Sequence, residues 1–159
     1  MHTHQGHFVT TTLLCVCIMV SSCTSDAPTM IKEELQTFAT KYTAAWCSQN
    51  AASVADHFAA DGSLKINAGE PAVGHDAITA SAQAFMSAFP DMVVRLDSLV
   101  LEEGRTEYHW TLTGTNTGPG GSGKPVHISG YEEWTINADG LIQASLGHFD
   151  EAEYARQLE

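Results

Sequence analysis

The sequence is poor in positive charge. Seven Lys and Arg residues stand against 19 Asp and Glu residues in a chain of 159, so the formal net charge is −12. Nucleic-acid binding depends on clustered Lys and Arg that neutralise phosphates, so this composition argues against a nucleic-acid partner. An acidic surface favours solubility but identifies no partner. The length suits one domain with one core.

Apolar runs long enough to cross a bilayer are also absent. The run from Phe8 to Val20 is too short to span one as a mature helix. It ends in Val20-Ser-Ser-Cys23 and is followed by polar residues, the layout of a secretory signal with small residues at the cleavage point. The tetrapeptide resembles a bacterial lipobox, in which the cysteine is lipidated and becomes the new N-terminus. Residues 1–7 depart from the usual signal because they contain no Lys or Arg.

We therefore expect a lipoprotein-type signal peptide over residues 1–22, a short linker over residues 23–30 and a domain over residues 31–159. The expected location is the cell envelope, either lipid-anchored at Cys23 or periplasmic or secreted. Contact with the membrane would be made only through the lipid. A cytoplasmic protein that starts at Met30 is the remaining alternative.

Cysteine is scarce in the expected mature chain. Cys15 and Cys17 lie in the apolar run and Cys23 would be acylated, which leaves Cys47 as the only free thiol. No intrachain disulfide is then possible. Cys47 follows Trp46 on an expected helix, where a small buried hydrophobe is a simpler interpretation than a nucleophile.

Motifs for phosphate, metal and nucleophilic chemistry are incomplete. Gly118 to Lys124 satisfies G-x-x-x-x-G-K, but Pro125 stands where a Ser or Thr must hold Mg²⁺. A mobile hairpin loop is the better interpretation. No pair of His residues has the i, i+4 helical spacing of a metal half-site, so we expect no metal site and no cofactor. No G-x-S-x-G elbow supports a Ser-His-Asp triad.

Helical periodicity in the first half of the chain gives way to strand alternation in the second. We expect helices over 31–46, 50–59 and 76–88, strands over 63–67, 92–102, 105–115, 125–137 and 141–148, and a last helical turn capped by Asp150. This order favours an α+β fold, with three helices packed on the concave face of a cone-shaped, curved antiparallel sheet.

Glu132 interrupts the apolar face of the expected strand 125–137. Alternation places it in line with Ile128, Gly130 and Trp134, on the face that should meet the core. A buried carboxylate is costly unless it is paired or neutralised, so it tends to persist where a site uses it. A structural Glu at a sheet edge, or a bulge that turns it outward, is the alternative.

Helices on one face of a strongly bent sheet leave a hollow that suits a small apolar ligand. The expected lining is Tyr42, Trp46, Phe85, Trp110, Glu132 and His148. A core without a cavity would use much the same aromatic residues.

Three segments resemble one protein family. Residues 107–118, EYHWTLTGTNTG, resemble the "HWT-x-TGTHTG" stretch of SnoaL-like proteins, which belong to the nuclear transport factor 2-like superfamily. Phe89-Pro-Asp91 matches the family's "FPD", and residues 139–158 resemble its "DGKI…WD…RQLG" ending. The resemblance covers roughly residues 31–158 and implies a cone-shaped α+β barrel, usually a homodimer built through the sheet. Members include polyketide cyclases, steroid isomerases and epoxide hydrolases, beside many that only bind.

The catalytic residues of the family do not carry over. Polyketide cyclases of this type have a catalytic Asp three residues before the position of Asp150, and that residue here is Gly147. Steroid isomerases place their Asp base around Ile66 or Asn67, and neither is an Asp. The histidine of "GTH" is Asn116 here.

We expect an exported domain that binds a small hydrophobic molecule, and the sequence does not decide whether it is an enzyme. If it is one, the resemblance favours isomerisation or cyclisation by proton transfer, with Glu132 as proton carrier and Tyr42 and His148 as hydrogen-bond partners. Two alternatives stay open. One is a non-catalytic binding or dimerisation module, and the other is a structural envelope protein whose barrel is filled by its own side chains.

Overall fold

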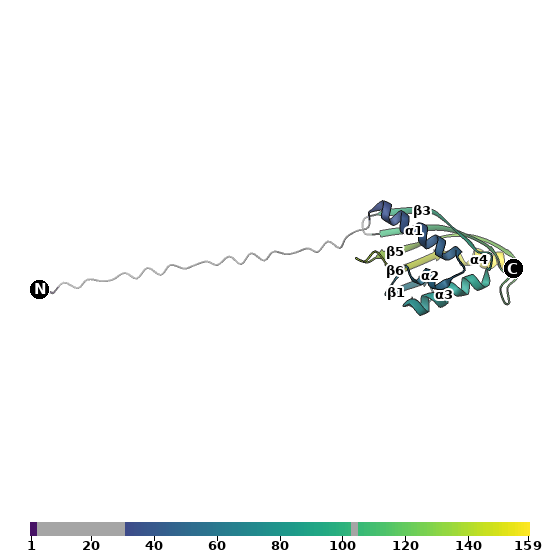
Figure 1. Cartoon of the computed structure of the whole chain (residues 1–159), viewed down its shortest axis with the longest axis horizontal. Helices are drawn as coiled ribbons and strands as arrows, with labels where there is room; N and C mark the ends of the chain where they lie inside the picture. The colour runs from purple at the N-terminus through teal and green to yellow at the C-terminus, as the bar shows by residue number, and fades with distance from the viewer. Residues whose placement is uncertain (3–30, 103–104) are drawn as a thin grey trace.

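The structure is a computed structural model that describes residues 1–2, 31–102 and 105–159 (Figure 1). Its elements are α1 (Lys32–Cys47), α2 (Ala51–Ala55), β1 (Phe58–Ile66), β2 (Ala72–Val73), α3 (His75–Ala88), β3 (Val93–Glu102), β4 (Arg105–Thr115), β5 (Pro125–Ile136), β6 (Ile142–Phe149) and α4 (Glu151–Leu158). The expected signal peptide, the linker and Cys23 lie outside the described residues. Among the helices that are described, none is both long and apolar enough to cross a membrane.

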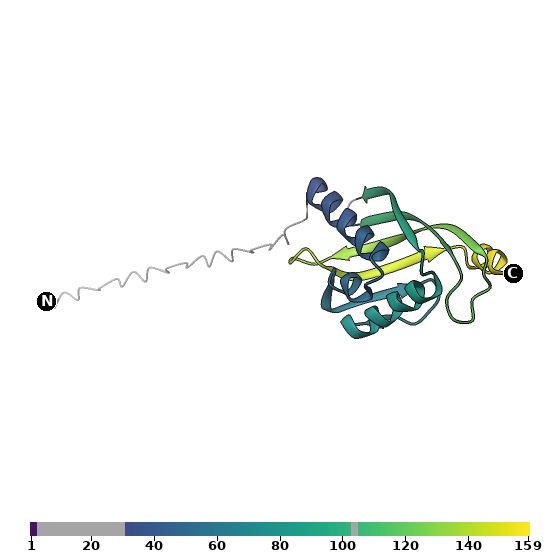
Figure 2. The ribbon, with the colours of Figure 1, turned by 45° about the vertical axis from the view of Figure 1, so that its right-hand side comes forward.

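Six strands form one curved sheet that does not close into a barrel (Figure 2). The strand order is β2-β1-β6-β5-β4-β3. All neighbouring strands are antiparallel except β1 and β6, which pair in parallel. The α+β class with a curved sheet is therefore confirmed.

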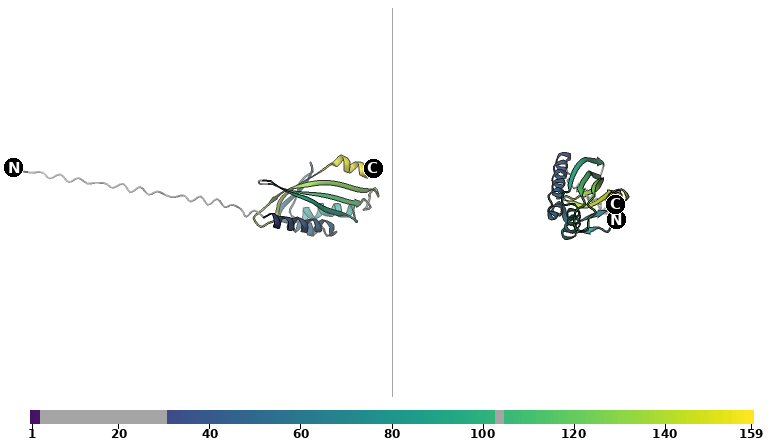
Figure 3. Two further views of the ribbon diagram at one scale, coloured as in Figure 1. Left: turned by 90° about the horizontal axis from the view of Figure 1, so that it is seen from above. Right: turned by 90° about the vertical axis from the view of Figure 1, so that its right-hand side faces the viewer.

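The helices α1, α2 and α3 precede most of the sheet in sequence and supply its cover. Figure 3 shows α1 and α3 on one face of the sheet, whereas α4 lies apart from them at the end where β6 finishes. On α1 the residues Leu35, Ala39, Tyr42 and Trp46 recur at spacings of three and four and are all buried. This stripe faces the sheet, as the amphipathic pattern predicts.

The predicted second helix is too long. It was expected over 50–59, but α2 ends at Ala55 and β1 begins at Phe58. Phe58 pairs with Ile142 of β6, and both side chains are almost fully buried. Pairing with a strand that is distant in the sequence therefore overrides the local helical pattern. The other predicted bounds, apart from the start of β1, agree to within one residue.

The loop between β4 and β5 is fastened to the end of α3. The Asn116 side chain donates to the Ala88 carbonyl oxygen over 3.3 Å and accepts from the Ser122 backbone N–H over 2.7 Å. The Gly118 backbone N–H donates to the same Ala88 oxygen. A Cβ atom on Gly118 would lie 1.9 Å from the Ser87 carbonyl oxygen, so only glycine permits this approach.

Two glycines on the helix-covered face of the sheet have opposite surroundings. A Cβ atom on Gly130 would lie 2.4 Å from the His148 carbonyl oxygen and 2.6 Å from the Trp110 ring. The missing side chain thus lets the Trp110 indole lie against the sheet. On Gly147, by contrast, the nearest atom to an added Cβ would be 3.4 Å away, which is ordinary contact.

We expect Gly130→Ala to lower the free energy of unfolding by about 1–3 kcal/mol, because the new methyl group overpacks the Trp110 site. Gly147→Ala is the matched control, and its effect should stay below about 1 kcal/mol because the added Cβ would make only ordinary van der Waals contacts. Urea denaturation of both variants measures the difference. Equal effects at the two positions would contradict the close approach of Trp110 to Gly130.

Candidate functional site

Glu132 lies on the helix-covered face of β5 and is only 6% exposed. Its Oε2 atom accepts three hydrogen bonds, from the Tyr42 hydroxyl over 3.0 Å, the Trp134 indole Nε1–H over 2.9 Å and the Ser145 hydroxyl over 2.6 Å. None of the ion pairs among residues 31–102 and 105–159 includes Glu132. The inward position of this carboxyl group, which the sequence predicted, is therefore present without a cation to neutralise it.

The three donors come from three different elements. Tyr42 is on α1, one turn before Trp46, and its side chain is fully buried. Trp134 follows Glu132 by two residues on β5, so strand alternation brings both side chains to one face. Ser145 is on β6 opposite Trp134, and Gly147 is opposite Glu132. The register between β5 and β6 thus brings the Ser145 hydroxyl to the carboxylate.

Burial and hydrogen bonding act on this carboxyl group in opposite directions. Burial raises the pKa of Glu132 above its ordinary value, and the hydrogen bonds from Ser145, Trp134 and Tyr42 oppose that rise without cancelling it. The pKa of Tyr42 is also raised, first by its own burial and then by the charge on Glu132. Tyr42 therefore acts as a neutral donor.

The two oxygens of Glu132 differ in their surroundings. All three donors meet at Oε2, whereas Oε1 has no hydrogen-bond partner among the described residues. A proton taken up at Oε2 would displace a donor, so the carboxyl group has to take up or release its proton at Oε1.

A cavity lies between the helices and the sheet beside Glu132. Its wall includes Trp46, Phe85, Tyr108, Trp110, Glu132 and Gly147. Of the described residues that line it, Glu132 is the only charged one. The centre of a water molecule could occupy about 50 Å³ of this cavity. One bound water needs about 10–15 Å³ on the same measure. The cavity therefore has room for a few waters or a small apolar group.

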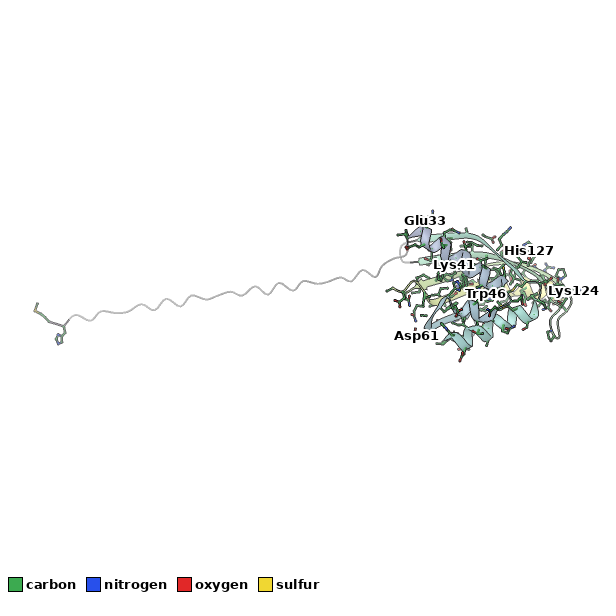
Figure 4. All side chains as sticks on the ribbon, in the orientation of Figure 1. Glu33, Lys41, Trp46, Asp61, Lys124 and His127 are labelled. Carbon is green, nitrogen blue, oxygen red and sulfur yellow. The ribbon has the colours of Figure 1, made fainter. Side chains whose placement is uncertain are left out.

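The structure brings most of the predicted site residues together. Trp46, Phe85 and Trp110 lie on the cavity wall, and Tyr42 lies behind it against Glu132. Trp46 occupies the last turn of α1, whereas Lys124 and His127 lie at the end of the molecule that carries α4 (Figure 4).

In the part of the chain that is described, no three His, Cys, Asp or Glu side chains come together as metal ligands would.

His148 does not join this group. Successive strand residues point to opposite faces, so His148 faces away from the cavity that Gly147 lines. Its ring stacks on Tyr131 with ring centroids 4.7 Å apart, and its Nε2 atom lies 3.2 Å from Glu133 Oε1. The predicted hydrogen bond between His148 and Glu132 is therefore not formed.

Two of the three residues that donate to Glu132 were missed by the sequence analysis. Trp134 could have been found from alternation, because it shares the face of Glu132 two residues along the strand. Ser145 could not, because its position depends on the pairing register of β5 with β6. Nothing in its sequence surroundings distinguishes it from an ordinary strand serine.

Glu132 should make stability depend on pH. Glu132 has a higher pKa in the folded state than in the unfolded chain, so it stabilises the folded state at pH values below 4.5, the ordinary pKa of a Glu side chain. This contribution is lost as pH rises through the pKa of the folded state. Glu132→Gln removes the titration. The free energy of unfolding of the wild type, relative to this variant, should therefore fall as pH rises from 4 towards 8 in urea titrations. A difference that does not change with pH would show that burial leaves the pKa of Glu132 unshifted.

Known structures with the same fold are distant in sequence. TsrD from Streptomyces laurentii superposes with a TM-score of 0.71 at 22% identity, over 82% of this chain and 98% of that chain. A hypothetical protein from Catenulispora acidiphila with a ketosteroid isomerase-like fold, in complex with trimethylamine, gives a TM-score of 0.68 at 16% identity, over 76% and 91%. TerC, co-crystallised with polyporic acid, gives 0.63 at 12% identity, over 77% and 96%.

No protein of curated function matches this sequence. The family model described as SnoaL-like polyketide cyclase, in contrast, matches residues 36–158. That match covers α1 from its second turn through α4, and thus both sides of the cavity. The chain therefore belongs to the SnoaL-like polyketide cyclase family.

Proposed function

We propose that this domain binds a small, mainly apolar molecule in the cavity beside Glu132 and moves a proton within it. The observation that supports the proposal is the Glu132 carboxyl group, which is buried without a cation on the wall of an apolar cavity. Buried acids with raised pKa values are typical of functional sites, because acid–base chemistry needs a group whose pKa lies near the working pH.

The geometry of Glu132 suits acid–base work. Its Oε1 atom takes a proton from one atom of the ligand and returns it to another, so the reaction consumes no other reactant. The pKa rise that burial causes brings the carboxyl group closer to neutral pH, where one group both accepts and donates. The hydrogen bonds from Tyr42, Trp134 and Ser145 hold the carboxylate in one orientation and stabilise its charge. The reaction class is isomerisation or cyclisation.

Small molecules in similar structures support ligand binding by this fold. One neighbour is in complex with trimethylamine and another is co-crystallised with polyporic acid. Both are small, although they differ greatly in shape and polarity. We infer that this chain also binds a small partner of its own.

A non-catalytic binding module is the second candidate, and Gly147 favours it. In this family's polyketide cyclases the resemblance places a catalytic Asp at that position, and here the glycine only widens the cavity beside Glu132. In that case the buried network around Glu132 would fix the fold, and binding would occur without turnover.

We also propose that the protein is exported, carries a lipid on Cys23 and forms a homodimer. The lipobox-like tetrapeptide ending in Cys23 and the polar stretch after it support the anchor. The dimer is proposed from the resemblance to dimeric members of the family. It would use the sheet face opposite the helices.

Glu132→Gln should abolish proton transfer while the fold survives. The probe is cyclopentanone in D₂O, with deuterium uptake at its α-carbons followed by proton NMR. We expect the wild type to accelerate uptake and the variant to lose about 10²–10⁴-fold of that acceleration, the usual contribution of a general base. Glu133→Gln is the matched control, because Glu133 lies on the opposite face of β5. Equal uptake with wild type and Glu132→Gln would remove Glu132 from the mechanism.

Mass spectrometry of protein purified from its own host tests the anchor. The mature chain should begin at Cys23 and carry the added mass of acyl chains. Cys23→Ala should remove that mass and release the protein from the membrane fraction, because one acylated residue supplies the attachment. A chain that begins at Met30, or an unmodified Cys23, would refute lipidation.

A further inference from the structure

The cavity beside Glu132 is small for a ligand-binding site. Its volume is about 50 Å³, whereas ligand pockets usually have about 300–1,000 Å³. A molecule larger than a few waters can therefore enter only if part of the wall moves. Four residues of the wall are half-buried and mark the side on which the cavity meets solvent: Ile66, Phe85, Trp110 and Phe149.

The two long helices on the wall are firmly held. The Tyr42 hydroxyl joins α1 to Glu132 over 3.0 Å, and Thr43 Oγ1 joins α1 to the Tyr108 hydroxyl over 2.8 Å. The end of α3 is held by the loop between β4 and β5, as described above. Moving either helix would break hydrogen bonds of groups that water reaches poorly, which is costly.

The last helix, α4, is attached more weakly. It has 8 residues, all of which the structure describes, and none of them is buried. Tyr154 packs half-buried against two aromatic rings, with its centroid 6.4 Å from that of Phe89 and 5.6 Å from that of Phe149. An element with so few buried apolar contacts belongs to the part of a structure that opens first.

Gln157 fastens the far end of α4 to the sheet. Its carboxamide accepts from the His127 backbone N–H over 2.7 Å and donates to the His127 carbonyl oxygen over 2.9 Å. The pairing of β5 with β6 begins only at Gly130, so Gln157 takes the place of a strand beside His127. These bonds are exposed, and water replaces them at little cost when α4 leaves.

Phe149 connects α4 to the cavity. Its ring lies on the cavity wall, between Tyr154 of α4 and the Trp110 ring, whose centroid is 6.4 Å away. Its backbone is fixed separately, because the Phe149 N–H donates to the Asn67 side chain over 3.0 Å. Once Tyr154 has left, the Phe149 ring can therefore adopt another rotamer while the strand stays in place.

We propose that α4 is a gate for the cavity. Its release from β5 frees the Phe149 ring, which turns away and admits the ligand, and its return closes the site. α4 stays helical and turns about Asp150, whose side chain caps it at the end of the sheet where β6 finishes (Figure 3). Closure would separate the ligand from water, as lids in other proteins do. This inference rests on the proposed use of the cavity as a binding site, but not on catalysis.

Amide hydrogen exchange of the unliganded wild type tests the release. The His127 N–H is bonded to Gln157, so it exchanges when α4 leaves. We expect it to exchange on the order of 10²-fold faster than the amides of residues 131–134, which pair with strands on both sides. Equal protection at the two places would show that α4 opens only with the whole domain, and the gate would be refuted.

A variant that does not touch Gln157 or His127 tests whether α4 moves as a unit. Tyr154→Ala should speed exchange at His127 about four- to tenfold, because both contacts belong to the same docked helix. Gln143→Ala is the control, because it removes a hydrogen bond to Asp61 at the other end of β6. It should leave exchange at His127 unchanged.

The neutral apolar dye N-phenyl-1-naphthylamine tests entry, because it is larger than the closed cavity and becomes fluorescent in apolar surroundings. In stopped-flow mixing with the wild type, the binding rate should level off at high dye concentration, since opening then limits entry. Gln157→Ala should raise that plateau about two- to tenfold, the usual effect of losing a hydrogen bond, and the matched Gln143→Ala should not. In Phe149→Ala the rate should rise with concentration without a plateau.

The possible results separate this inference from the proposed function. If the wild-type rate rises without a plateau, or if Gln157→Ala leaves the plateau unchanged, α4 is not the gate, although the cavity binds ligands. If the dye binds neither the wild type nor Phe149→Ala, cavity binding itself fails and the inference falls with it. Exchange is measured on the unaltered protein, so it decides whether α4 opens separately even where a variant fails to fold.

Discussion

The convergence of three donors on Glu132 Oε2 is the interaction on which the rest of the site depends. It joins α1, through Tyr42, to β5 and β6, through Trp134 and Ser145. A buried carboxylate without a cation is costly, and these hydrogen bonds offset part of that cost. They also leave Oε1 as the oxygen that can exchange a proton. One arrangement therefore supports the packing of these elements and the chemistry proposed for Glu132.

Two sheet positions without a side chain shape the wall of the cavity. At Gly130 the absent Cβ lets Trp110 lie against the sheet, and at Gly147 it leaves space beside Glu132. The second glycine stands where the resemblance to polyketide cyclases predicts an acid. The family is shared, but this site keeps a single carboxyl group and surrounds it with aromatic rings. Membership of the family therefore describes the fold and does not by itself assign the chemistry.

Local patterns in the sequence were reliable where one element determines the outcome. The stripe on α1, the alternation on β5 and the cap formed by Asp150 all depend on residues close in sequence, and the structure contains each of them. Predictions that needed two elements were less successful. The helix expected over 50–59 gave way to β1 at Phe58, because Phe58 pairs with Ile142 of β6. His148 was assigned to the wrong side of the sheet relative to Glu132.

The sequence by itself determined the α+β class, the inward position of Glu132 and three aromatic residues of the cavity wall, because periodicity decides which face a side chain occupies. Only the tertiary structure decided which groups meet there. Ser145 reaches Glu132 through the register of two strands, and His148 pairs with Glu133 because Gly147 occupies the inner face. Register and helix placement are long-range properties, so no local pattern encodes them.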